Sequence, residues 1–297
     1  MSSQNPPASL APTAAPILVA VLGIFVLTVM DSFLKKLTQG HSVADIALAR
    51  YLVAAAACLP FAFAGGMRRP SLAALKAQAT RSLSVLATAL LFITALKHLP
   101  LSEALTLTFL APSLVALFGR VLLKEPVSKL TGWSIAISFL GVLAVAGKDI
   151  AHWRNPTEDL VGVGAALGAA VAYALSLVWL RARAQADGVV ETVLIQNVLL
   201  TLYLLPIAWF ETGAPLVGLA ADWPFAVAVG VLGGGGHLLL GWAYRHAAAA
   251  KIGAVEYTGL IWALIIGVAW FGEWPGPNVL LGAALIIGGS SLLLVRR

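Results

Sequence analysis

Long apolar runs recur along almost the whole chain, separated by short polar segments. Ten of them approach the roughly twenty residues that a helix needs to cross the apolar core of a bilayer. Their predicted bounds are 16–35, 43–64, 81–97, 101–121, 129–147, 160–181, 190–210, 223–245, 251–271 and 278–295. Membrane-spanning β-strands are about ten residues long and alternate polar with apolar positions, which these runs do not. The pattern therefore predicts an all-α polytopic membrane protein with ten transmembrane helices.

Composition points to lipid as the main solvent of this chain. Hydrophobic residues make up 60% of the sequence and charged residues 11%, whereas soluble domains carry roughly 25% charged residues. The single cysteine, Cys58, lies inside an apolar run, so neither a disulfide framework nor a cysteine metal site is predicted. Residues 1–15 contain several prolines but no lysine or arginine. We expect them to form a short disordered cytoplasmic tail rather than a cleaved signal.

The basic residues indicate an orientation. With a cytoplasmic N-terminus, the inside segments hold thirteen lysines and arginines against five outside, and Arg50 lies within a span. The inside residues are Arg68, Arg69, Lys76, Arg81, Arg120, Lys124, Lys129, Arg181, Arg183, Arg245, Lys251, Arg296 and Arg297; the outside residues are Lys35, Lys36, Lys97, Lys148 and Arg154. The positive-inside rule then places both termini in the cytoplasm and explains the net charge of +6 without nucleic acid. We expect a multi-pass protein of a bacterial inner membrane, in contact with lipid.

The two halves of the chain resemble each other at a nearly constant offset. The segment from Asp45 to Pro60 matches the segment from Glu191 to Pro206 at an offset of 146. Further pairs match at an offset of 148: Ala95, Lys97 and His98 with Ala243, Arg245 and His246; Phe109 with Tyr257; Glu125 with Glu273; Gly141 with Gly289. Each half holds five spans, so the second copy enters the membrane inverted, as in many secondary transporters. The predicted repeats are residues 16–147 and 160–296.

Several short segments resemble the EamA-type branch of the drug/metabolite transporter superfamily. They are Ala49-Arg50-Tyr51, Ala95-Leu-Lys-His-Leu-Pro100, and the stretch from Leu110-Ala-Pro112 to Leu123-Lys-Glu125. The second copy keeps Glu273 but has Leu260 where that family has proline. A narrower resemblance is to the YddG group of amino-acid exporters. It implies ten helices, cytoplasmic termini, a monomer, a cavity between the third, fourth, eighth and ninth spans, and efflux of amino acids, including aromatic ones.

Charged residues inside the membrane are costly and are the first candidates for function. Arg50 is interpreted as an anchor for a substrate carboxylate, or alternatively as a structural partner of Asp45 or of a nearby carbonyl. Asp31 is a candidate for proton coupling, or alternatively a partner of Lys35 one turn away. His237 follows four consecutive glycines near the middle of its span. It is a candidate for substrate binding and for coupling, with a structural histidine bonded to a neighbouring helix as the alternative.

Aromatic and further polar residues extend this candidate site. Trp262, Trp242 and Tyr257 are predicted to line a cavity for an apolar or aromatic side chain, against the alternative of an interfacial belt. Tyr173, Phe92 and Thr88 are weaker cavity candidates, because hydroxyl groups often bond to their own helix. Glu256 is a coupling candidate, or a residue stabilised at a helix start. Glu125 and Glu273 are interpreted as residues that fix loops. No metal site or cofactor is predicted.

Alternating access by the two repeats is the function that this pattern favours. Substrate would bind near the midplane, and glycine-rich segments 162–168 and 230–236 would allow the helices to rock. An intramembrane enzyme would need a catalytic motif such as His-Glu-x-x-His, which the sequence lacks. A channel would favour rings of like polar groups. Export of other metabolites or drugs, and a membrane protein without transport, remain as alternatives. The substrate class we expect is small molecules, most simply amino acids.

Overall fold

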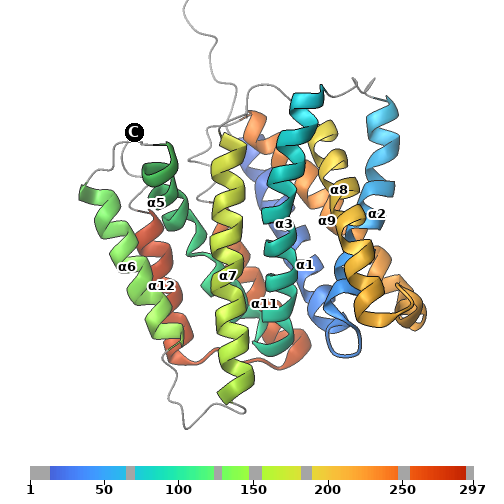
Figure 1. Cartoon of the computed structure of the whole chain (residues 1–297). Helices are drawn as coiled ribbons and strands as arrows, with labels where there is room; N and C mark the ends of the chain where they lie inside the picture. Colours follow the sequence, from blue (N-terminus) through green and yellow to red (C-terminus); the bar gives the residue numbers. More distant parts are fainter. Residues whose placement is uncertain are drawn as a thin grey trace, which may run out of the picture.

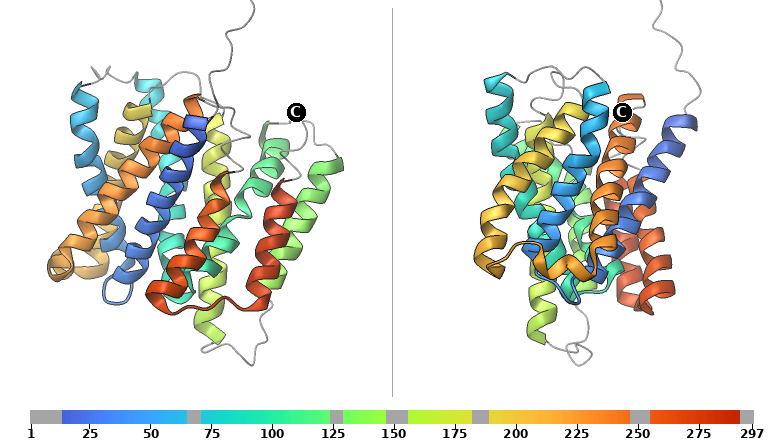
Figure 2. Two further views of the ribbon diagram at one scale, coloured as in Figure 1. Left: turned by 180° about the vertical axis from the view of Figure 1, so that it is seen from behind. Right: turned by 90° about the vertical axis from the view of Figure 1, so that its right-hand side faces the viewer.

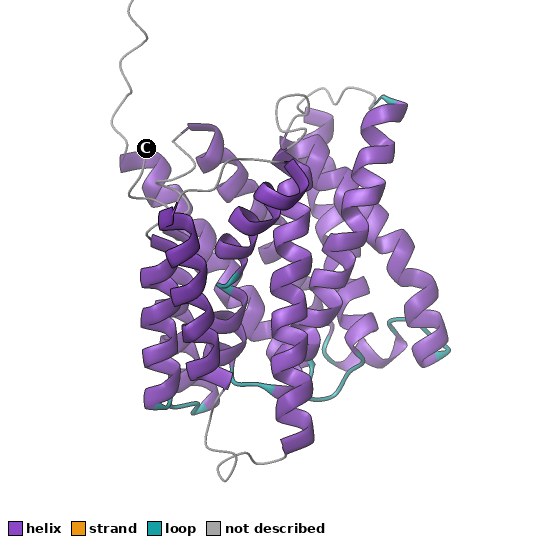
Figure 3. Ribbon diagram, turned by 60° about the vertical axis from the view of Figure 1, so that its left-hand side comes forward, coloured by secondary structure: helices purple, strands orange, loops and turns teal. Residues whose placement is uncertain are grey.

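The computed structural model describes residues 14–64, 71–123, 129–146, 156–181, 189–246 and 255–291. Within these ranges the chain is helical and contains no strand (Figures 1 and 3). Most of the predicted N-terminal tail and Glu125 lie outside the described residues. Ala14 and Ser291 lie at the same end of the bundle, as an even number of spans requires (Figure 2). We call the opposite end the distal end.

The helices follow the predicted spans. The first half contributes α1 (Ala14–Leu37), α2 (Val43–Ala64), α3 (Leu72–His98), α4 (Leu101–Thr108), α5 (Ala111–Leu123) and α6 (Lys129–Ala146). The second half contributes α7 (Pro156–Arg181), α8 (Val189–Thr212), the short 3₁₀ helix η2 (Val217–Ala221), α9 (Trp223–His246), α11 (Thr258–Phe271) and α12 (Pro277–Ser291). Among the described residues, seven helical stretches are long and apolar enough to cross a membrane, and three shorter apolar helices complete the predicted set. The chain is a polytopic membrane protein.

Equivalent helices of the two halves make equivalent contacts in the bundle. Helix α1 packs on α9 and α3 packs on α7, which correspond to the first span on the eighth and the third span on the sixth. Helix α2 packs on α8, and α6 on α12, so each of these pairs joins equivalent spans of the two halves. The pair α6 and α12 lies at one edge of the bundle (Figures 1 and 2). This symmetry is the arrangement that an inverted repeat predicts.

The fourth span is broken near its middle, which the hydrophobic pattern does not reveal. Helix α4 ends at Thr108, a turn covers Phe109 and Leu110, and α5 starts at Ala111. Pro112 suits the first turn of α5, because proline has no backbone N–H to contribute to a continuous helix. In the second half a turn at Tyr257 precedes α11, at the position equivalent to Phe109. The rings of Phe109 and Tyr257 lie 5.6 Å apart, so the two breaks meet between the halves.

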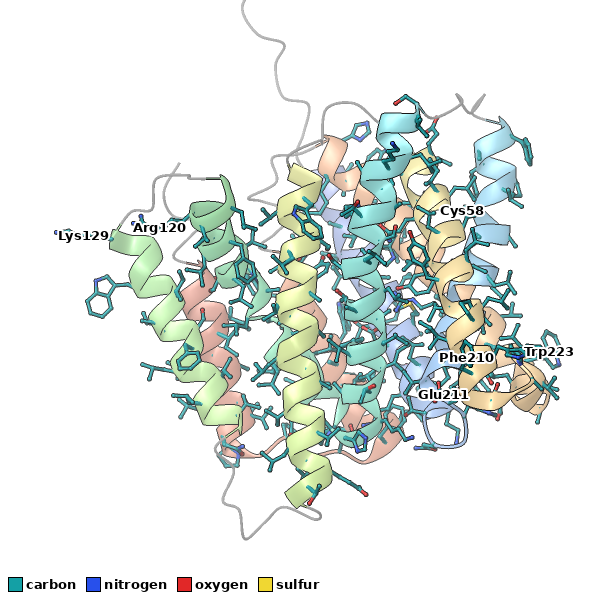
Figure 4. All side chains as sticks on the ribbon, in the orientation of Figure 1. Cys58, Arg120, Lys129, Phe210, Glu211 and Trp223 are labelled. Atoms are coloured by element: carbon teal, nitrogen blue, oxygen red, sulfur yellow. The ribbon has the colours of Figure 1, made fainter. Side chains whose placement is uncertain are left out.

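The third span starts earlier than its apolar run suggests. Helix α3 begins at Leu72, and its candidate membrane segment is Leu75–His98. Arg81, predicted to lie in an inside loop, is therefore inside the helix. Figure 4 shows other cations, Arg120 and Lys129, near the end of the bundle where α5 ends and α6 begins. Helix propensity and packing against α7 and α8 extend α3 beyond the apolar stretch.

Glycines bring the helices close at several crossings. A Cβ at Gly230 would lie 2.3 Å from the Cβ of Val53 and 3.0 Å from the carbonyl oxygen of Arg50. A Cβ at Gly236 would lie 2.7 Å from the Leu27 side chain. Gly162 and Gly168 meet side chains of Leu99 and Leu91 in the same way. Segments 162–168 and 230–236 therefore include glycines that permit close packing, and whether they also allow rocking stays a prediction.

Polar contacts between the halves close the distal end. Lys35 donates to Glu273 Oε1 at 2.8 Å and to the carbonyl oxygen of Leu99 at 2.5 Å. Glu273 Oε2 accepts the backbone N–H of Leu101 at 2.8 Å. The prediction that Glu273 fixes a loop is confirmed, because it ties the turn before α4 to the segment before α12. Two further contacts are His41 Nε2 with Asp222 Oδ2 at 2.8 Å, and Asp45 Oδ1 accepting the Leu216 N–H at 3.0 Å.

Candidate functional site

Polar side chains from both halves meet inside the bundle. We call them the central polar cluster: Asp31, Arg50, Arg81, Tyr173, His237, Tyr244 and Glu256. They come from α1, α2, α3, α7, α9 and the turn before α11. Electrostatic interactions link Arg50 to Asp31 and His237, Arg81 to His237 and Tyr173, and Tyr173 to Glu256. The cluster thus forms one continuous network of titratable groups.

Arg50 is placed where α2 crosses α9. Gly233 of α9 faces it, and a Cβ there would lie 3.6 Å from Arg50 Nε. The Arg50 guanidinium lies 5.1 Å from the ring centroid of Tyr51, within the range of a cation–π contact. The alternative of pairing with Asp45 is not found among the described ion pairs, and Asp45 Oδ1 accepts the Leu216 N–H instead. Among the described residues, no ion pair of Arg50 is formed.

Asp31 is a buried carboxylate, with 8% of its surface exposed. The predicted alternative, a pair with Lys35 one turn away, is wrong because Lys35 binds Glu273 instead. The charge that acts on Asp31 is Arg50, from the next helix along the chain. A carboxylate and a guanidinium in electrostatic range, without a direct ion pair between them in the described structure, leave bonding capacity on both groups.

His237 is bonded to its own helix and not to a neighbouring one, and its part in substrate binding and coupling stays a prediction. Its Nδ1 lies 2.7 Å from the Gly233 carbonyl oxygen, one turn earlier on α9. A carbonyl only accepts, so Nδ1 carries the hydrogen and the neutral ring offers Nε2 as an acceptor. The side chain is exposed and is not packed into the hydrophobic core. The bond to its own helix orients the ring and leaves Nε2 available to a ligand.

Arg81, like Tyr244, is a member of the cluster that the sequence did not indicate as a site. Its Nε donates to Gln78 Oε1 at 3.0 Å, and its Nη2 donates to Gln196 Oε1 of α8. Gln196 occupies the position equivalent to Arg50 in the second half. The two arginines therefore mark equivalent crossings, α2 with α9 and α3 with α8. The repeat gives no signal for Arg81, because the equivalent position at an offset of 148 holds Val229.

Glu256 and two tyrosines form the other side of the cluster. Tyr244 Oη donates to Glu256 Oε1, which joins α9 to the turn before α11. Tyr173 of α7 lies in electrostatic range of Glu256 and of Arg81. Tyr173 and Tyr244 are both exposed by about two fifths, at 41% and 39%. The structure thus brings the predicted candidates Tyr173 and Glu256 together and adds Tyr244.

Trp262 packs edge-on against Phe25 of α1, with ring centroids 5.1 Å apart. Its Nε1 is buried and has no hydrogen-bond partner in the described structure. An indole N–H without an acceptor is uncommon in a protein interior, because burying a polar group without a partner is costly. Tyr257 lies one turn earlier and contacts Phe109 across the two helix breaks. Both aromatic candidates therefore lie between the halves.

Three predicted cavity residues have local partners. Trp242 stacks on His246 of its own helix, with centroids 4.1 Å apart, and no contact with the central polar cluster is described. Phe92 packs against the hydrophobic core. Thr88 Oγ1 donates to the Ser84 carbonyl at 2.8 Å, which is the self-bonding alternative. In the described ranges, no group of three or more histidines, cysteines and carboxylates is arranged to hold a metal ion.

The arrangement resembles known transporters over its whole length. The model of the EamA-like transporter family matches residues 14–147 and 160–295. The chain is 24% identical over 273 residues to the pseudopaline exporter CntI of Pseudomonas aeruginosa, covering 91% of this chain and 93% of that protein. It is 31% identical over 265 residues to a Streptantibioticus cattleyicolor protein named "probable terminal-alkyne amino-acid exporter", covering 86% and 85%.

The fold also matches a solved structure. A crystal structure, titled only as that of a protein, superposes with a TM-score of 0.64 at 17% identity and covers 94% of this chain and 97% of the other. That likeness concerns the fold alone. The two family matches together span nearly all of the chain, one on each half. This chain belongs to the EamA-like transporter family.

Proposed function

We propose that this protein exports amino acids and closely related small metabolites by alternating access. The observation that carries the proposal is the group formed by Asp31, Arg50 and His237 inside the bundle. An amino acid carries a carboxylate and an ammonium group, and this group offers a guanidinium to the first, and a carboxylate and an imidazole acceptor to the second. The related exporters support the class of activity, and one of them is named for an amino acid.

Aromatic side chains supply the apolar part of the proposed site. Trp262, Phe25 and Tyr257 lie between the halves, where a substrate side chain would contact them. The unpartnered Nε1 of Trp262 would donate to a substrate oxygen. Rings of this size discriminate among side chains mainly through buried area, which favours aromatic and large apolar amino acids.

The inverted pairing of helices suggests how the site changes sides. The distal contacts of Lys35, His41 and Asp45 with the second half hold that end together. In the proposed cycle these contacts separate, and the equivalent faces of the other end come together. The breaks at Phe109 and Tyr257 are positions where the fourth and ninth spans bend. We propose cytoplasmic termini in a bacterial inner membrane, which makes the distal end the outer side and the movement an export.

A gradient would drive this movement, because the sequence holds no ATP-binding motif. If protons are coupled, the groups that would carry them are Asp31, His237 and Glu256, which belong to one electrostatic network through Arg50, Arg81 and Tyr173. The variants Asp31→Asn and Glu256→Gln test which of these residues carries the proton. A variant that still exchanges amino acids but no longer responds to a pH gradient identifies the coupling residue.

Counterflow in proteoliposomes tests the proposal. Vesicles are loaded with one unlabelled amino acid, and accumulation of a labelled aromatic amino acid is followed. We expect accumulation with wild type, at least a tenfold fall with Arg50→Gln, and a fall with His237→Ala, because each removes a charge-assisted or directional bond. Lys36→Gln is the matched control, since Lys36 is exposed at the distal surface and its described hydrogen bond is to Gln39. Exchange of sugars or nucleosides but of no amino acid would contradict the amino-acid proposal.

A further inference from the structure

Arg81 is a cation inside a membrane-spanning helix without a described acidic partner. Its hydrogen bonds go to the neutral amide oxygens of Gln78 and Gln196, and neither described ion pair includes it. A charge in the middle of a membrane helix costs about 2.5–3.5 kcal/mol on insertion scales. Amide oxygens satisfy hydrogen-bond donors but do not neutralise charge. The guanidinium therefore keeps a full positive charge inside the bundle.

The two glutamines orient Arg81 and leave part of it available. A guanidinium has five N–H donors in a fixed plane, and Gln78 and Gln196 occupy Nε and Nη2. The remaining donors include both hydrogens of Nη1, and the side chain is only partly buried. An arginine held in this way presents a preformed face to a carboxylate. The bond to Gln196 also links α3 of one half to α8 of the other.

Arg81 belongs to the same accessible interior as the amino-acid group. Both Arg50 and Arg81 act electrostatically on His237, whose exposed ring lies in the interior of the bundle. Arg81 also acts on Tyr173, whose side chain is exposed there as well. Gln196, the hydrogen-bond partner of Arg81, lies two turns inside α8, so the guanidinium is held within the bundle and does not extend to the headgroup region.

We propose that Arg81 is a second anion subsite, which makes amino acids with a second carboxylate the preferred substrates. This rests on the proposed amino-acid site at Asp31, Arg50 and His237. The α-carboxylate and ammonium groups bind there, and the distal carboxylate of the substrate binds Arg81, with His237 between them. Suitable molecules are acidic amino acids and amino-acid conjugates that end in a carboxylate. Gln78 and Gln196 act as positioning residues for the guanidinium.

The test compares carboxylates with their amide isosteres. Competition for counterflow is measured with aspartate, glutamate and 2-aminoadipate, each against the corresponding ω-amide. Because the amide keeps size and shape, the ratio within a pair reports the second charge alone. We expect at least a tenfold preference for the carboxylate at the best chain length in wild type, equivalent to about 1.4 kcal/mol. The optimal length reports the separation of the two subsites.

Variants assign that preference to Arg81. Arg81→Gln should abolish the carboxylate preference, measured as the ratio within each carboxylate–amide pair on that same variant, so that a change in overall transport does not enter the result. Arg81→Lys should keep part of it, and Gln196→Leu should reduce it while the charge remains. Lys36→Gln serves as the control. A preference that survives Arg81→Gln, or amides that compete as well as carboxylates at every length in wild type, overturns the subsite.

The outcomes also separate the subsite from the underlying function. If amino acids compete without any effect of the second carboxylate, the amino-acid site stands and the Arg81 subsite fails. If plain dicarboxylates such as glutarate compete in an Arg81-dependent manner while no amino acid does, the subsite stands and the amino-acid proposal fails. If neither class competes, both fail.

Discussion

Lys35 at the distal end has a close acidic partner, whereas the two central arginines have none among the described residues. Lys35 at the distal end has a carboxylate at 2.8 Å and a carbonyl at 2.5 Å, and the second oxygen of that carboxylate accepts a backbone N–H. Arg50 and Arg81 in the middle of the bundle have neutral or distant partners in the described structure. The difference indicates that the distal charges serve to hold the halves together. The central arginines lack a described ion pair, which is why we propose them as substrate-binding groups.

Breaking the distal pair should have the largest effect on stability. Glu273→Gln removes the carboxylate bonded to Lys35, although the charge of Glu103 still acts on Lys35. Removing one partner of a buried pair costs about 3–5 kcal/mol. The free energy of unfolding in mixed detergent micelles measures the loss. Glu273 accepts with both oxygens, so an amide that keeps the Leu101 N–H bond turns its NH2 group toward Lys35, and the variant removes both the charge and the hydrogen bond to Lys35.

The double variant Lys35→Met with Glu273→Gln checks the reason for that loss. Without the cation, the neutral amide has no unpaired charge beside it, so we expect more than half of the lost stability to return. Equal destabilisation of the single and double variants would mean that the contact matters through shape, and the contrast with the central arginines would fail.

Filling the crossing beside Arg50 should have the next largest effect. Gly230→Ala would place a methyl group 2.3 Å from Val53 Cβ and 3.0 Å from the Arg50 carbonyl oxygen. Overpacking of this kind costs about 1–3 kcal/mol, and α2 must move away from α9. The midpoint temperature of thermal unfolding and the rate of counterflow should both fall.

Gly235→Ala is the matched control on the same helix. A Cβ there meets nothing within 4 Å. Alanine has higher helix propensity than glycine by about 0.8–1.0 kcal/mol in water, so this change should be neutral or stabilising. Similar losses for both variants would indicate that α9 needs flexible glycines rather than close contact with α2.

The sequence predicts the architecture well and the site only partly, for physical reasons. Span length and the repeat offset are periodic signals, so the helices, their number and the inverted pairing follow from them. The periodic signals do not identify the partner of Lys35, because Glu273 is in the other half and the nearest acid by helical spacing is Asp31. Arg81 was assigned to a loop because its charge interrupts the apolar run, although α3 continues through it. The break before Pro112 lies within a uniformly apolar stretch and produces no change in hydropathy.

Trp262→Phe should lower the free energy of unfolding by about 1 kcal/mol, and it tests the aromatic part of the proposed site. The change keeps an aromatic ring against Phe25, an interaction worth roughly 0.5–1.5 kcal/mol, and removes an N–H that has no acceptor in the described structure. If Nε1 binds a substrate oxygen, the apparent affinity for aromatic amino acids should fall several-fold in addition to this loss of stability. If Trp262 is only a packing residue, the loss of stability should come without any change in affinity.

Arg50→Gln should have the smallest effect on stability, and the size of that effect tests the comparison of distal and central charges most directly. Removing a cation that has no described ion pair relieves the cost of keeping that charge in the membrane. It also removes the attraction to Asp31 and the contact with Tyr51. These changes oppose each other, so we expect the free energy of unfolding to move by less than about 1 kcal/mol. A loss as large as that of Glu273→Gln would mean that Arg50 is paired as firmly as Lys35. The central charges would then be structural, and transport activity would have to be assigned to other residues.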